Sequence, residues 1–175
     1  MEYDGLFFLS YGFYNIWDGT PSSYLTAITA HETAHQWWFG KVGNDQALEP
    51  WLDESMATFC EELFYENFYP RSMNWWRDGR INEFLPTGFI NKPVKDYDSY
   101  ESYRSSVYLN GALFFDELRS TIGEDAFFEF LRDYAGRYAD QRASASDFFA
   151  VLREHTSVDL SPLMEKYFDP AFLQD

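Results

Sequence analysis

The stretch His-Glu-Thr-Ala-His at residues 31–35 constrains this chain more than any other part of the sequence. Residues four apart on an α-helix lie one turn above each other on the same face. If the stretch is helical, His31 and His35 therefore direct their imidazoles towards one point. Glu32 lies one step round the helix, where it reaches a metal-bound water rather than the metal. The spacing predicts a helix that carries two zinc ligands and a general base.

Two histidines leave the site incomplete, because a catalytic zinc takes three protein ligands and keeps one position for water. We expect the third ligand to be Glu54, which lies on a second predicted helix at residues 51–62. Thr58 and Glu61 fall on the same stripe of that helix, so either could orient a ligand from behind. Glu61 in particular could accept the free N–H of an imidazole.

The competing interpretation is a pair of core histidines on an amphipathic helix. The five-residue pattern alone arises by chance in roughly one chain of this length in a few hundred. A glutamate separated from His35 by eighteen residues, with Trp51 and Leu52 shortly before it, makes that coincidence improbable. The sequence therefore favours a zinc site.

Residues 31–37 together with residues 49–58 resemble the signature pair of the zinc aminopeptidase family of gluzincins, which includes aminopeptidase N and leukotriene hydrolase. The family pattern is H-E-x-x-H, eighteen residues, then E. Residues 1–3 resemble the end of the G-x-M-E-N exopeptidase motif, and residues 108–112 resemble the Y-x-K-G-A segment. The resemblance covers nearly the whole chain and implies a fragment of the family's catalytic domain.

For a family member we expect His31, His35 and Glu54 to bind one Zn²⁺, which polarises the scissile carbonyl and activates a water molecule. Glu32 would take the proton of that water and deliver it to the leaving amine. The substrate would be a peptide.

The resemblance also implies that Tyr108 donates a hydrogen bond to the oxyanion of the tetrahedral intermediate. From composition alone Tyr97, Tyr100 or Tyr103 could equally reach inward, and only the family spacing favours Tyr108. Glu2, in the exopeptidase motif, would bind the free α-amino group of the substrate.

The chain departs from the family pattern at four positions, none of which is an expected metal ligand or the base. Tyr3 and Asn110 replace the usual asparagine and lysine of the two shorter motifs, Asp53 replaces a common asparagine, and Ser55 replaces a glycine. The changes at Tyr3 and Asn110 leave open how the substrate is positioned, and with it strict aminopeptidase specificity. The alternatives to an aminopeptidase are therefore a related endopeptidase or epoxide hydrolase, and a zinc-binding but inactive fragment or interaction module.

Length and charge limit the remaining possibilities. At 175 residues the chain is expected to form a single domain over residues 1–175. A net charge of −16 disfavours nucleic acid and anionic membranes as partners. No apolar run is long enough to span a membrane. The single cysteine, Cys60, gives weak support for a reducing, cytoplasmic location and is expected to be a buried apolar residue.

The N-terminus and the aromatic content bear on what surrounds this chain. No basic region precedes the first apolar segment, so we do not expect a signal peptide. Because Met1 falls inside a motif, we expect upstream sequence of the parent protein to be missing. Aromatic residues make up 21% of the chain, which suggests surfaces that face further domains or a partner subunit.

The expected fold is mainly α (α+β), a helical zincin or thermolysin-like subdomain with a short N-terminal strand. The strand is expected at residues 6–11, between two glycines. Residues 86–99 are expected to form an irregular loop, either a wall of the substrate groove or a plain connector. Helices are predicted within residues 22–40, over 51–62, from 70 to before 86, over 105–121 and 124–137, after a capping box at 144–147, and from 161.

Overall fold

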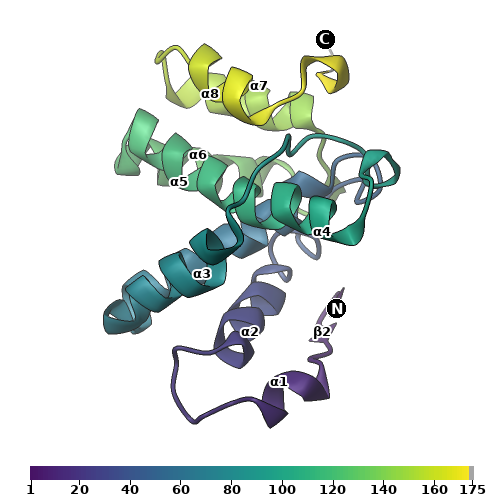
Figure 1. Cartoon of the computed structure of the whole chain (residues 1–175). Helices are drawn as coiled ribbons and strands as arrows, with labels where there is room; N and C mark the ends of the chain where they lie inside the picture. The colour runs from purple at the N-terminus through teal and green to yellow at the C-terminus, as the bar shows by residue number, and fades with distance from the viewer. Residues whose placement is uncertain (174–175) are drawn as a thin grey trace.

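Helix α3 (Glu54–Phe68) occupies the middle of the molecule, with α2 (Tyr24–Ala34) packed on one side and α5 (Gly111–Ile122) on the other (Figure 1). The structure is a computed structural model and describes residues 1–173. Helix α5 also contacts α6 and α8, and α6 packs against α7. The remaining helices are α1 (Tyr11–Asn15), α4 (Tyr100–Tyr103), α6 (Glu124–Arg137), α7 (Ala145–His155) and α8 (Ser161–Tyr167).

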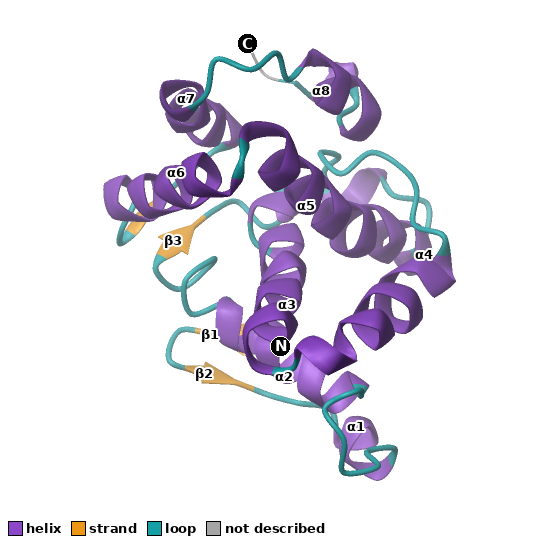
Figure 2. Ribbon diagram, turned by 90° about the vertical axis from the view of Figure 1, so that its left-hand side faces the viewer, coloured by secondary structure: helices purple, strands orange, loops and turns teal. Residues whose placement is uncertain are grey.

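The strands are short and peripheral. An antiparallel hairpin pairs β1 (Glu2–Tyr3) with β2 (Leu6–Phe7), and a parallel pair joins β3 (Val42–Gly43) to β4 (Gln141–Arg142). Figure 2 shows the hairpin beside α2, away from the layer of α6, α7 and α8. The mainly α fold predicted from the sequence is confirmed. No helix among the described residues is long and apolar enough to cross a membrane.

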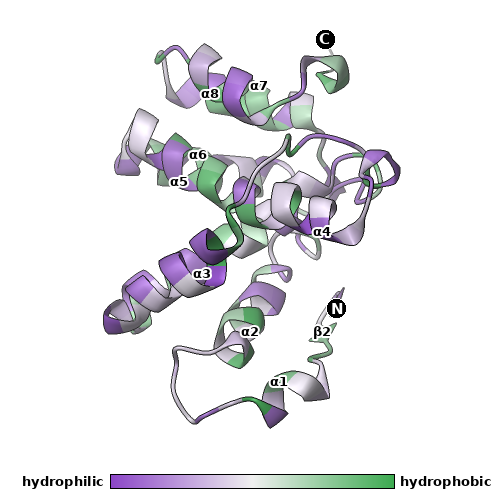
Figure 3. Ribbon diagram, in the orientation of Figure 1, coloured by the Kyte–Doolittle hydropathy of each residue, from purple (hydrophilic) through white to green (hydrophobic). Residues whose placement is uncertain are grey.

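The core is largely aromatic. Trp51 is fully buried, and its ring packs against five phenylalanines from α5, α7 and the end of α8, which are Phe114, Phe115, Phe148, Phe149 and Phe168. Buried aromatic rings of this size contribute several kcal/mol each to a core, roughly 3–5 kcal/mol on truncation. Trp51 therefore fixes the start of α3 against the C-terminal helices. Figure 3 shows hydrophobic and hydrophilic residues sharing α5 and α7, as helices with one buried face require.

Several helix boundaries follow from local capping, and the capping box predicted at residues 144–147 is one of them. The Ser23 hydroxyl accepts the Thr26 N–H at the start of α2. Ser144 and Asp147 form a reciprocal capping box at α7. Helix α6 has the predicted bounds of 124–137.

Other elements differ from the sequence expectation. The strand expected at 6–11 is limited to β2, because Ser10 caps α1 instead of continuing the strand. A 3₁₀ turn at Pro50–Leu52 delays the start of α3 to Glu54. The helix expected from residue 70 is a 3₁₀ turn followed by a π-helical segment at Trp75–Ile81.

The helix expected over 105–121 begins earlier, at Tyr100, where Ser99 and Ser102 form a capping box. Between α4 and α5 the segment Arg104–Asn110 is π-helical. Such i→i+5 turns are rare and often occur at functional sites. This one carries Tyr108.

Candidate metal centre and active site

The predicted metal-ligand pair, His31 and His35, lies where helix α2 ends. His31 belongs to the last turns of α2, and His35 follows its final residue. The Gly40 N–H donates to the His35 carbonyl at 2.8 Å, so the chain folds back on itself here. This turn brings the Trp38 carbonyl within 3.1 Å of His35 Nδ1. Because a carbonyl only accepts, Nδ1 must carry the proton, and the lone pair of Nε2 faces inward.

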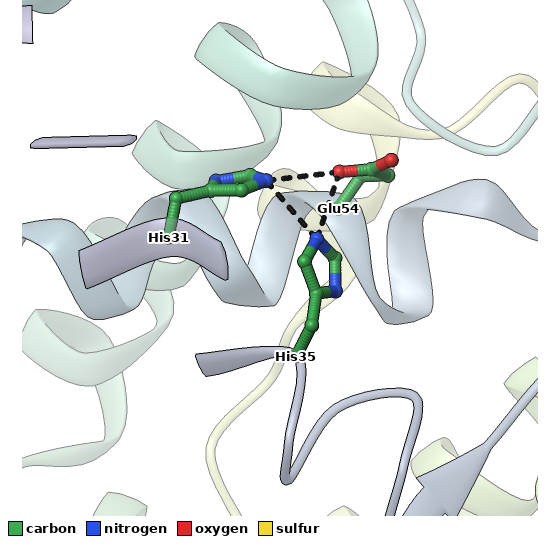
Figure 4. Close-up of side chains that lie close together, drawn as sticks. All are labelled: His31, His35 and Glu54. Atoms are coloured by element: carbon green, nitrogen blue, oxygen red, sulfur yellow. Dashed lines mark hydrogen bonds and ion pairs between the residues drawn. The ribbon is translucent and has the colours of Figure 1, made fainter. Parts of the chain in front are cut away.

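Three potential ligand atoms meet at one point (Figure 4). His31 Nε2 lies 3.1 Å from His35 Nε2 and 3.1 Å from Glu54 Oε2, and His35 Nε2 lies 3.3 Å from the same oxygen. Ligand atoms about 2.0–2.1 Å from a tetrahedral ion stand about 3.3 Å apart. The observed separations therefore fit a zinc ion, as does the chemistry of two imidazoles and one carboxylate.

Both residues predicted to support a ligand lie at the far side of the His31 ring. Glu61 Oε1 is 3.2 Å from His31 Nδ1, and Thr58 Oγ1 is 3.3 Å from it. The Thr58 hydroxyl donates its own proton to the Glu54 carbonyl at 2.8 Å, so it meets His31 as an acceptor. His31 Nδ1–H is therefore shared between the two oxygens, which fixes the tautomer with Nε2 facing the ligand point.

A buried arginine holds Glu61 in place. Arg80 Nη2 donates to Glu61 Oε1 at 2.8 Å, and Trp76 Nε1 donates to Oε2 at 3.0 Å. Burial opposes ionisation of Glu61, but the charge of Arg80 and the contact with His31 outweigh it and hold the pKa of Glu61 below its ordinary value. No sequence motif pointed to Arg80. Arg80 and Trp76 both lie on the π-helical segment Trp75–Ile81, and this proximity in the sequence is the one feature that relates the two donors to Glu61.

The electrostatics of the centre favour a positive charge between its side chains. Burial opposes protonation of His31, but hydrogen bonds to Glu54 and Glu61 outweigh it and raise the pKa of His31 to about 9. Burial also opposes ionisation of Glu54, yet hydrogen bonds from both histidines hold the pKa of that carboxyl below its usual range. A cation bound between His31, His35 and Glu54 would supply the positive charge that these side chains favour.

Glu32, the predicted base, is buried and directly follows His31 in helix α2. Its Oε2 atom is buried and has no hydrogen-bond partner among the described residues. Its Oε1 atom lies 2.6 Å from the nitrogen of Met1, so the start of the β1–β2 hairpin passes beside the base. A buried carboxylate oxygen without a partner fits a group that receives a water or substrate.

Tyr108 contacts His31, one of the predicted metal ligands. Its ring stacks on the His31 imidazole with centroids 5.7 Å apart and an interplanar angle of 14°. Tyr103 packs edge-on against Tyr108, Tyr97 donates its hydroxyl to the Phe89 carbonyl, and Tyr100 is exposed. Burial, followed by the nearby charge of Glu54, raises the pKa of Tyr108 well above its ordinary value, so its hydroxyl keeps its proton.

Residues 86–91 are fastened to the segment that carries Tyr108. Asn110 Nδ2 donates to the Gly88 carbonyl at 2.8 Å, and Ser106 Oγ donates to the Thr87 carbonyl at 3.1 Å. A Cβ at Gly88, whose φ is +101°, would stand 2.3 Å from Ser106 Oγ. The loop thus supports the Tyr108 turn from outside, and Asn110 faces this loop.

Glu2 lies on β1, partly exposed, and its Oε1 accepts a hydrogen bond from Gln46 Nε2 at 3.1 Å. Gln36, which directly follows His35, also forms hydrogen bonds to the β1–β2 hairpin. Gln36 accepts the Gly5 N–H at 2.8 Å and donates to the Tyr3 carbonyl at 3.1 Å. Neither glutamine was singled out from the sequence, because their partners in the β1–β2 hairpin lie more than thirty residues away.

Comparison with known proteins agrees with this geometry. A family model described as "Peptidase family M1 domain" matches residues 17–167. Aminopeptidase M1-A of Oryza sativa subsp. japonica is 27% identical over 154 residues, which cover 82% of this chain and 17% of that protein. Aminopeptidase N of Streptomyces lividans is 27% identical over 157 residues, which cover 83% of this chain and 18% of that protein. The chain thus spans less than a fifth of the length of these relatives.

Solved structures show the same fold. An M1 zinc metallopeptidase from Deinococcus radiodurans is 23% identical and superposes with a TM-score of 0.65, over 86% of this chain and 34% of that one. Its E323A mutant bound to Tyr-Ser-Ala gives a TM-score of 0.66 at 22% identity, over 89% of this chain and 35% of that one. The family resemblance drawn from the motifs is confirmed, and zinc is the cofactor that both the family and the donor set indicate.

Proposed function

Because the chain belongs to peptidase family M1, we propose that residues 1–175 are part of the catalytic domain of a zinc-dependent aminopeptidase, which removes N-terminal residues from peptides. The observation that carries the proposal is the meeting of the side-chain atoms of His31, His35 and Glu54, 3.1–3.3 Å apart. Glu32, which directly follows His31, is buried, and its Oε2 has no hydrogen-bond partner among the described residues. Two imidazoles and two carboxylates, with the ligand atoms at this spacing, are the groups that a hydrolytic zinc site requires.

The metal would be held by His31, His35 and Glu54. When bound, zinc supplies a Lewis acid that polarises the scissile carbonyl and makes a water molecule more acidic. The Glu32 carboxylate, one helical step from His31, would accept the proton of the attacking water and pass it to the leaving amine. Glu61 and Thr58 would keep His31 in the required tautomer throughout.

The remaining side chains would act on the substrate. The protonated hydroxyl of Tyr108 would donate a hydrogen bond to the oxyanion that develops on the scissile carbonyl. Glu2 would bind the α-ammonium group of the peptide, so that only bonds one residue from a free N-terminus reach Glu32. The net charge of −16 is compatible with a substrate that has a positive end.

The direct test compares three peptides and two proteins. Zinc-loaded protein is incubated with Tyr-Ser-Ala, with its N-acetylated form, and with a longer blocked peptide, and products are followed by mass spectrometry. We expect release of tyrosine from the free peptide only. The Glu32→Gln variant should retain zinc and lose about 100-fold or more in kcat.

The alternatives give different outcomes. Internal cleavage of the blocked peptide in preference to the free one would indicate an endopeptidase, and turnover of an epoxide without peptide cleavage would indicate an epoxide hydrolase. Equal hydrolysis by wild type and Glu32→Gln would show that Glu32 is not the base. Zinc binding without any turnover would indicate a non-catalytic module.

We also propose that further domains of the parent protein, or a partner subunit, cover the aromatic surface behind α2. Trp17 and Trp37 are about half exposed there, at 49% and 57%. They border an apolar hollow of about 500 Å³ whose wall includes Phe64 and Ala30. Exposed apolar surface of this kind is typical of an interface.

A further inference from the structure

A single glutamine connects the strand that carries Glu2 to the helix that carries Glu54. Gln46 lies in the loop between the metal-ligand helices, and its Nε2 atom donates to Glu2 Oε1 at 3.1 Å and to Asp53 Oδ2 at 2.8 Å. A glutamine amide nitrogen has two hydrogens, so each carboxylate receives one. In the structure the amide presents its nitrogen to both carboxylate groups.

The far end of this bridge is anchored at the metal centre. Asp53 is fully buried, and its other oxygen, Oδ1, accepts the Glu54 N–H at 2.8 Å. Both oxygens of Asp53 are thus engaged, one by the backbone at the start of α3 and one by Gln46. A displacement of Gln46 relative to Glu54 would break one of these bonds, so the position of Gln46 is tied to that of the ligand helix.

The near end leaves Glu2 able to bind a cation. Gln46 engages Oε1, and the structure shows no hydrogen bond to Oε2 from residues 1–173. The amide is neutral, so it orients Glu2 without cancelling its negative charge. An arginine or lysine in the same place would form an ion pair and remove the attraction for an α-ammonium group.

We propose that Gln46 is the positioning residue of the amino-terminal subsite: it holds Glu2 at a set distance from the zinc ligands and so determines which bond of the peptide reaches Glu32. This inference rests on the proposed role of Glu2. Gln36 holds the hairpin through backbone groups alone. Gln46 is the residue among those described that orients the Glu2 side chain itself.

The bridge is tested first in the resting protein, without any turnover. Both side-chain amide protons of Gln46 should show the downfield shifts and slow exchange of hydrogen-bonded groups in NMR spectra, and Glu2→Gln and Asp53→Asn should each alter them. Gln141, whose amide nitrogen donates to the exposed Arg137 carbonyl at 3.0 Å, is the internal reference. Gln46 signals like those of a solvated surface glutamine in wild type would overturn the proposal.

The consequence is tested by binding to zinc-loaded Glu32→Gln protein, which retains peptide without cleaving it. The substitution Gln46→Met keeps the length of the side chain and removes both hydrogens, and Gln141→Met is its control. We expect Gln46→Met to reduce the preference for Tyr-Ser-Ala over N-acetyl-Tyr-Ser-Ala by about tenfold, the scale of a hydrogen bond to a charged group. Binding of the acetylated peptide and zinc content should stay unchanged.

The outcomes separate this inference from the proposed function. If the Glu32→Gln protein prefers the free amine and keeps that preference when Gln46→Met is added, Gln46 does not position Glu2 and the aminopeptidase proposal stands. If both peptides weaken equally, Gln46 has only a general structural role and the inference fails. If the Glu32→Gln protein with Gln46 intact shows no preference for the free peptide, the aminopeptidase proposal fails. The NMR measurement alone then decides whether Gln46 orients Glu2.

Discussion

The hydroxyl of Ser55 donates a 2.5 Å hydrogen bond to the carbonyl oxygen of Val107, and both residues are buried. Ser55 follows the predicted ligand Glu54 in helix α3, and Val107 precedes Tyr108 in the π-helical segment. This bond therefore joins the helix of the third ligand to the turn that presents the predicted oxyanion donor. It also explains how closely α3 and α5 approach each other.

That close approach makes Gly111 a position without room for a side chain. A Cβ on Gly111 would stand 2.0 Å from Ser55 Oγ and 2.5 Å from Ser55 Cβ. We expect Gly111→Ala to lower the free energy of unfolding by about 3 kcal/mol, because overpacking of a buried contact forces backbone to move. Urea unfolding monitored by circular dichroism measures this loss.

Two variants control for other causes. A methyl group added at Gly136, in α6, would meet no atom within 4 Å, so Gly136→Ala should be neutral or stabilise by up to about 1 kcal/mol. In a Ser55→Gly background, Gly111→Ala should cost much less than in wild type. An equal cost in both backgrounds would contradict the proposed clash.

Removal of one imidazole should abolish zinc binding. His35→Ala leaves two ligands, and we expect its zinc content, measured by mass spectrometry of the metal, to fall from one equivalent to near zero. Zinc added to apo wild type should raise Tm, because the ion binds only the folded site, and the variant should show no rise.

The third histidine provides the matched control for this prediction. His155 pairs with Asp133 at 2.9 Å, far along the chain from the ligand pair. His155→Ala should keep one equivalent of zinc. A zinc loss of similar size in both variants would show that metal content reports folding and not ligation.

Loss of the Tyr108 hydroxyl should slow the chemical step. Tyr108→Phe keeps the ring that stacks on His31 and removes the proton donor. We expect kcat to fall about 100-fold with little change in KM or zinc content, since the hydrogen bond would form in the transition state. Tyr100→Phe, at an exposed tyrosine, should leave kcat unchanged. A larger loss of kcat in Tyr100→Phe than in Tyr108→Phe would show that Tyr108 is not the oxyanion donor.

The buried pair of Arg80 and Glu61 should be sensitive to removal of one partner. Arg80→Met leaves Glu61 charged and buried, and we expect a loss of about 3–5 kcal/mol in the free energy of unfolding. Arg142→Met breaks an exposed pair with Asp45 and should cost less than about 1 kcal/mol. Chemical denaturation compares the two, and similar small costs would mean that Glu61 finds another counter-charge.

Stability should fall with rising pH because of Glu62. Burial, then the nearby Asp116, raises the pKa of Glu62 to about 7 from 4.5, and the ion pair with Arg77 only partly opposes this. The native state therefore keeps this proton at pH values where the unfolded chain has released it. The stability contributed by protonated Glu62 is complete below about pH 4.5 and is lost as the pH rises through about 7.

The variant Glu62→Gln cannot titrate and isolates this contribution. We expect the free energy of unfolding of wild type, relative to Glu62→Gln, to decrease by on the order of 1–3 kcal/mol between pH 5 and pH 8. Urea unfolding of both proteins across this range measures the difference. Parallel pH profiles would show that Glu62 titrates alike in the folded and unfolded chains.

Features set by neighbouring residues were predictable from the sequence. The four-residue spacing of His31 and His35 places both on one helical face whatever the rest of the chain does. The capping box at Ser144 and the bounds of α6 likewise depend on groups within a few residues of each other. For these, local hydrogen bonds and periodicity are sufficient, and they also carried the recognition of the family.

Tertiary structure decided which distant side chains support the site. Arg80 reaches Glu61 across 19 residues and Gln46 reaches Glu2 across 44, and no local pattern marks either pair. In the π-helical segment that carries Tyr108, the Val107 carbonyl likewise accepts a bond from Ser55, 52 residues earlier. Such partners are selected by packing and by the cost of leaving a buried polar group unpaired, and both exist only once the helices have assembled.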